Sequence, residues 1–151
     1  MKKQVFLAPL ILSLMWLAAT PDVFARPRSP ADLAQRCVNR MDAKAQRCCD
    51  KIDTKVNLAI PRINALLDVG KINCAARVAD RVKKRIIALA QRREHRITRL
   101  GNSCSRVLLD IGEVELANAV QDAKSSEIDS VNACSDNAVA LIDKALEGDS
   151  E

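Results

Sequence analysis

The sequence predicts an all-α protein, an up-down-up bundle of three long helices that is stapled by disulfides. First, apolar residues recur at intervals of three and four, which is the period of a helix with one buried face. Second, the aromatic residues Phe6, Trp16 and Phe24 all lie within the first 25 positions. The core of the remaining chain must therefore be made of small aliphatic side chains, which favour closely packed helices over sheets. Third, all six cysteines follow this segment.

The first 25 residues have the pattern of a signal peptide. Two lysines precede an apolar stretch at positions 5–19, and Val23-Phe24-Ala25 offers small residues to a signal peptidase. The stretch is shorter than the roughly 20 residues that span a bilayer, so we expect no membrane anchor after cleavage. We expect 1–25 to be removed and 26–151 to form a single helical bundle domain that is secreted or periplasmic.

The first helix is predicted over 30–68. Ser29 can cap it, Pro30 suits its first position, and Asp32 can reach the free backbone amides. Pro61 lacks an amide proton, so we expect a kink or a break near it. The predicted buried seam of this helix comprises Val38, Met41, Ala45, Cys48, Ile52, Val56, Ala59, Ile63 and Leu66.

Glycines place the other two helices. Gly70 and Gly101 each follow a periodic run and suit the left-handed turn that closes a helix, so the second helix is predicted over 71–100. The third helix is predicted from 103 or 113 to 147, because Gly112 is a further expected break. The predicted seams are Ile72, Ala75, Ala79, Val82, Ile86, Leu89, Ile97 and Leu100, then Ile128, Val131, Ala138, Leu141 and Ala145.

An even number of cysteines in a small exported domain predicts disulfides, and helix geometry selects among the pairings. With a reversal near residue 69, Cys37 stands nearly level with Cys104. With a second reversal near residue 101, Cys74 stands within about one helical turn of Cys134. The preferred pattern is therefore Cys37 with Cys104 and Cys74 with Cys134.

This pattern leaves Cys48 and Cys49 within the first helix, where a bond between neighbours would be strained. One interpretation is structural: Cys48 lies on the core seam, or one of the two cysteines belongs to a disulfide that the preferred pattern assigns wrongly. A second is an intermolecular disulfide that gives a homodimer, and a third is a reactive thiol pair. Metal binding lacks the three- or four-residue ligand spacing of a helical site, so no metal or cofactor is predicted.

Charge is segregated along the chain. Residues 77–106 carry ten basic and two acidic side chains, whereas residues 107–151 carry two basic and eleven acidic ones. One interpretation is that a basic second helix packs beside an acidic third helix, which fixes their order. The other is a cationic stripe that faces an anionic partner. The candidate residues for that stripe are Arg77, Arg81, Lys83, Lys84, Arg85, Arg92, Arg93, Arg96 and Arg99.

Catalysis and nucleic-acid binding are both disfavoured. The single histidine, His95, stands among charged residues and is expected on the surface, and no aromatic residue after position 25 can stack on bases. We therefore expect a non-enzymatic binding or structural protein that interacts with a protein or an anionic envelope component. The alternatives are a carrier of an apolar small ligand in the bundle core, and a protein that uses Cys48 and Cys49 for redox chemistry or metal binding.

Overall fold

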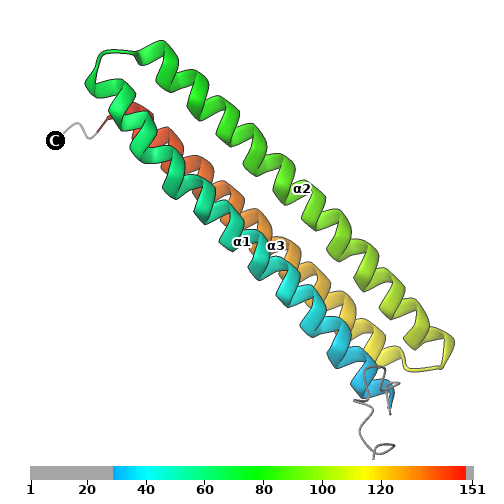
Figure 1. Cartoon of the computed structure of the whole chain (residues 1–151). Coiled ribbons are helices and arrows are strands. Elements are labelled where there is room, and N and C mark those ends of the chain that lie inside the picture. The colour runs from blue at the N-terminus through cyan, green and yellow to red at the C-terminus, as the bar shows by residue number, and fades with distance from the viewer. Residues whose placement is uncertain (1–28, 149–151) are drawn as a thin grey trace, which may run out of the picture.

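A computed structural model describes residues 29–148 as an up-down-up bundle of three helices. Helix α1 spans Pro30–Asp68, α2 spans Ile72–Asp110 and α3 spans Val114–Glu147. Each helix packs along both others, and α1 and α3 run in the same direction (Figure 1). The predicted all-α fold is confirmed, whereas the predicted signal peptide at 1–25 lies outside the described residues.

Helix α1 begins as predicted and is longer than its proline suggests. The Ser29 hydroxyl accepts a hydrogen bond from the Asp32 amide at 3.1 Å, and Pro30 occupies the first turn. The helix continues through Pro61 to Asp68, so the expected break is wrong. A kink without a break at this position stays a prediction.

The two reversals lie at Gly70 and Gly112, whose φ angles of +71° and +85° are in the left-handed region that glycine adopts without strain. The reversal at Gly70 and the break at Gly112 are confirmed, and with the latter the start of the third helix near 113. The reversal at Gly101 is wrong, because α2 continues through that residue to Asp110. A Cβ at Gly101 would lie 2.8 Å from Cγ of Lys124 on α3. This glycine therefore permits close packing of two helices, and Gly112 makes the turn.

The core consists of small aliphatic residues from all three helices, as predicted. In α1 every predicted seam residue is buried except Val38 and Leu66, which are half-buried. Two predicted seam residues are exposed, Ile72 at the start of α2 (67%) and Leu141 on α3 (50%). Core residues that the sequence analysis missed are Ala90, Leu108, Ala117, Val120 and Ile142.

Two disulfides tie α1 to both of its neighbours. The Cys37–Cys104 bond joins α1 to α2 with a Cα–Cα distance of 6.3 Å, which confirms the predicted pair. The second bond joins Cys49 of α1 to Cys134 of α3, with a Cα–Cα distance of 5.7 Å. Structural disulfides of this kind fit an oxidising compartment.

The predicted pairing of Cys74 with Cys134 is wrong. It assumed a reversal at Gly101, but α2 ends at Asp110, and this longer helix places Cys74 level with the C-terminal end of α3. Cys134 lies about 20 Å back along α3 from that end. Cys49 is the nearer partner because α1 and α3 run parallel, and each of the two cysteines lies about 20 residues after the start of its helix.

Candidate functional site: a cationic groove between α1 and α2

The remaining cysteines do not form a thiol pair. Because Cys49 is bonded to Cys134, the alternative of two adjacent reactive thiols is wrong. The structural interpretation is confirmed, since Cys48 is buried in the core and Cys49 forms a disulfide that the preferred pattern assigned wrongly. The free cysteines are Cys48 and Cys74. Cys48 is fully buried, and this burial raises the pKa of its thiol, although the guanidinium of Arg93 acts in the opposite direction. Cys74 is exposed at the start of α2.

Neither the metal-ligating side chains nor the single histidine forms a site in the described residues. Across residues 29–148, no three His, Cys, Asp or Glu side chains gather in a way that could hold a metal ion. His95 is exposed, as predicted, and its Nε2 lies 3.4 Å from Nη2 of Arg99, one turn further along the same helix. The side chain that His95 contacts is therefore a cation, Arg99, and not a nucleophile.

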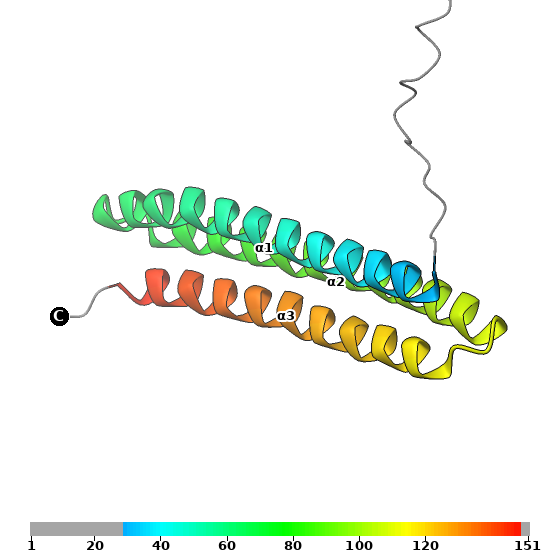
Figure 2. The same cartoon turned by 90° about the horizontal axis from the view of Figure 1, so that it is seen from below.

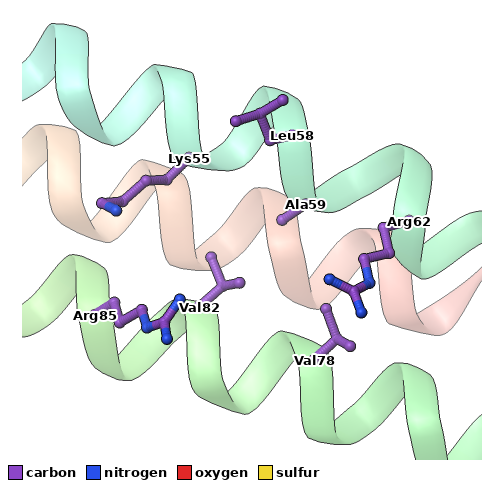
Figure 3. A pocket seen from close by; sticks show the side chains of 7 residues that line it. All are labelled: Lys55, Leu58, Ala59, Arg62, Val78, Val82 and Arg85. Atoms are coloured by element: carbon purple, nitrogen blue, oxygen red, sulfur yellow. The ribbon is translucent and has the colours of Figure 1, made fainter.

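A hollow of about 200 Å³ opens at the seam between α1 and α2, and it combines an apolar floor with basic edges. Figure 3 shows Arg62 and Lys55 reaching from α1 and Arg85 standing on α2. Ala59, Val78 and Val82 lie between the two helices, and Leu58 stands at the outer rim of the hollow on α1. Leu58 is 73% exposed, so a large apolar side chain faces solvent beside three cations.

A second hollow of about 160 Å³ continues the same seam toward the other end of the bundle. It is lined by Lys51 of α1 and by Leu89, Arg92, Arg93 and Arg96 of α2. We call the two hollows together the cationic groove. Along the described part of the chain, no acidic side chain lines either hollow. From Val78 to Arg96 the groove follows α2 for about 27 Å.

The structure brings together only part of the stripe that was predicted on the second helix. Arg85, Arg92, Arg93 and Arg96 line the groove, whereas Lys83 faces α3. The other predicted residues are exposed on α2 outside the groove lining, and they are Arg77, Arg81, Lys84 and Arg99.

Sequence reasoning missed the α1 half of the groove, which is formed by Lys51, Lys55 and Arg62. A signal for it was present. Basic residues recur along α1 at steps of four and three, at Arg40, Lys44, Arg47, Lys51 and Lys55, and such steps hold side chains on one helical face.

The acidic residues of the bundle gather elsewhere. In residues 29–148 a single ion pair links α2 to α3, with Nζ of Lys83 2.7 Å from Oδ1 of Asp143. Burial and, to a smaller extent, the charge of Asp42 on α1 raise the pKa of Glu127 on α3. Asp42 on α1 and Glu127 on α3 therefore lie near each other, and neither lines the cationic groove.

Comparisons with known proteins found no protein family, no curated protein and no solved structure that matches this chain. None of the helices in residues 29–148 combines the length and the apolar character that a bilayer-spanning segment requires. The groove is therefore interpreted from its own residues.

Proposed function

We propose that the protein is an exported, non-enzymatic bundle that binds an anionic partner, a protein or an envelope component, in the cationic groove. The observation that carries this proposal is that seven cations from two helices line an apolar floor, and that among the described residues no acidic side chain lines the two hollows. An electropositive concave surface of this kind attracts anions, and its apolar floor adds contact area once they are bound.

Placement of the cations also supports binding over a purely structural role. A structural role for the basic helix would pair it with acidic α3, but Lys83–Asp143 is the one such ion pair between these helices in the described residues. The groove arginines lie on the α1 side of α2 instead. Holding so many like charges along one seam costs stability, a cost that a bound anion would offset.

The two hollows of the cationic groove open at the seam between α1 and α2, and the largest core side chains of the described residues are fully buried. A carrier of an apolar ligand would instead need an enclosed space in the core. The groove therefore supports an anionic partner better than an apolar ligand in the bundle core.

The test measures binding of a fluorescent poly-glutamate and of vesicles that contain anionic phospholipid. The groove variant carries Lys51→Gln, Lys55→Gln and Arg62→Gln. Three exposed charge contacts contribute roughly 1.5–3 kcal/mol together, so we expect a loss of affinity of about tenfold or more, and near-complete loss at about 0.5 M salt. Poly-glutamate binding alone would indicate an acidic protein partner, and vesicle binding alone an envelope lipid.

A matched control removes three cations outside the groove lining, through Lys71→Gln, Arg77→Gln and Lys84→Gln. Its net charge equals that of the groove variant, and all three side chains are exposed. We expect its affinity to stay within about threefold of the unmodified protein. Equal losses in both variants, or binding unaffected by salt, would refute the groove as the contact surface.

A further inference from the structure

Helix α3 carries a regular row of acids on its outer face. Glu115, Asp122, Asp129 and Asp136 follow one another at intervals of seven residues, and all four are exposed. We call this row the acidic ridge. Beside each acid, four residues on, stands a small exposed side chain: Ala119, Ser126, Ala133 and Ala140. The ridge is therefore narrow, and another surface can approach its backbone closely.

Helix α2 carries an arginine row with the same period. Arg85, Arg92, Arg99 and Arg106 also follow one another at intervals of seven residues, and all four are exposed. Arg85 and Arg92 line the cationic groove, and Arg99 and Arg106 extend the row toward the end of α2. We call this row the arginine stripe.

The two rows match in spacing. Seven residues advance an α-helix by about 10.5 Å, so successive acids and successive arginines are separated by the same distance. A strict seven-residue period drifts by about 20° per repeat on a straight helix, and here the drift is equal on both rows. Two such helices keep their rows in contact when they cross at the shallow angle of a coiled coil.

Within one molecule the two rows face apart. Arg85 and Arg92 of the arginine stripe lie at the seam between α1 and α2. The acidic ridge is exposed on α3, which Figure 2 shows on one side of the α1–α2 pair. Within residues 29–148 one ion pair links α2 to α3, and it joins Lys83 to Asp143. The rows can therefore satisfy each other only between two molecules.

We infer that the occupant of the cationic groove is the acidic ridge of a second copy of this chain. The inference rests on the proposed function, since it names the partner of the same groove. Because groove and ridge lie on different faces, two copies joined in this way leave one groove and one ridge unfilled. Such a heterologous contact adds further copies, into open chains or a ring, and does not stop at a closed dimer.

The first test follows the mass of the purified protein by sedimentation velocity, with Cys74 alkylated so that no intermolecular disulfide contributes. For four exposed charge pairs we expect a dissociation constant on the order of 1 mM at low salt. The weight-average mass should then about double at about 1 mM protein and return to that of the monomer at about 0.5 M salt. A monomer under both conditions overturns the inference.

The second test uses two neutralised variants. One carries Arg85→Gln, Arg92→Gln and Arg99→Gln, and the other carries Asp122→Asn, Asp129→Asn and Asp136→Asn. Each alone should stay monomeric, but their mixture should give a one-to-one complex and nothing larger, because a single intact groove meets a single intact ridge. A mixture without this capped complex overturns the inference. Circular dichroism checks that both variants fold.

The same variants separate this inference from the proposed function. The ridge variant keeps its groove, so it should bind poly-glutamate as tightly as the unmodified protein while failing to self-associate. If poly-glutamate binds the groove but the unmodified protein never self-associates, the ridge is wrong as the occupant and the proposed function stands. If the Lys71, Arg77 and Lys84 control loses self-association as fully as the stripe variant, the contact depends on net charge alone and the inference fails.

Discussion

Removal of the Cys49–Cys134 disulfide is expected to cost the protein about 4 kcal/mol of unfolding free energy. The bond closes a segment of 85 residues, for which the chain-entropy relation gives about 4.6 kcal/mol if it acts alone. It does not act alone, because the Cys37–Cys104 bond already shortens the path. Through that bond, Cys49 and Cys134 are separated by about 42 residues, which lowers the expected contribution to about 3.9 kcal/mol.

The assay is urea unfolding of the double variant Cys49→Ala with Cys134→Ala, followed by helical circular dichroism. With an m value of about 1–3 kcal/mol/M, the midpoint should fall by at least about 1 M. The control Cys74→Ala removes an exposed thiol, leaves both bonds intact and should change stability by less than about 0.5 kcal/mol. A loss below about 1 kcal/mol, or a non-reduced peptide map that joins Cys74 to Cys134, would refute the reasoning.

Three other expectations follow from the fold. Thiol titration of the native protein should find one reactive group, Cys74, and denaturation should expose a second thiol, that of Cys48. Rapid labelling of both cysteines without denaturant would contradict the burial of Cys48. Gly101→Ala should lower the unfolding free energy by about 1–2 kcal/mol, because the new Cβ collides with the Cβ and Cγ atoms of Lys124. This loss should exceed the gain from the better helix propensity of alanine. A rise in stability would show that the two helices separate easily. Glu127→Gln should raise the unfolding free energy at pH 7 by less than about 1 kcal/mol. The pKa of the Glu127 carboxyl is raised above its ordinary value of 4.5 in the folded state, so the folded state loses stability as this carboxyl ionises with rising pH. In urea titrations the gain should vanish below about pH 4, where the carboxyl is protonated in both states.

The architecture was predictable because local signals agreed with one another. Ser29 and Pro30 mark the start of α1, and Gly70 marks the reversal after it. The apolar seam of α1 also identified its buried face, since small side chains at steps of three and four leave little choice of face. Start, end and buried face of the first helix therefore followed from the sequence.

The second reversal was misplaced because glycine has two uses that look alike in a sequence. Gly112 supplies a positive φ angle, whereas Gly101 supplies the absence of a side chain. Only the position of Lys124 on a different helix distinguishes the two roles. The misplaced reversal changed which residues of α2 and α3 were expected to lie at the same height along the bundle. It therefore also produced the wrong partner for Cys134.

The groove was half predictable for a related reason. Charge counted along the chain identified α2 as basic, and Arg85, Arg92 and Arg96 do line the groove. The contribution of Lys55 and Arg62 depends on which face of α1 meets α2, and a count along the chain carries no information about that. The seven-residue rows of α2 and α3 were present in the sequence, but their meaning requires knowing that they face apart.

The arrangement of the disulfides bears on the groove itself. Cations on α1 and α2 face one another across the seam, as Lys55 and Arg85 do, and like charges at such a seam favour separation of the helices. The Cys37–Cys104 bond fixes α1 to α2 covalently, and Cys49–Cys134 fixes α1 to α3, so α1 cannot leave the bundle to relieve this repulsion. The described core contains no aromatic side chain, and aliphatic side chains alone provide its apolar contacts. Covalent linkage therefore lets the bundle hold cations on both sides of one seam, and the anionic partner that we propose would meet a groove whose two walls are already in place.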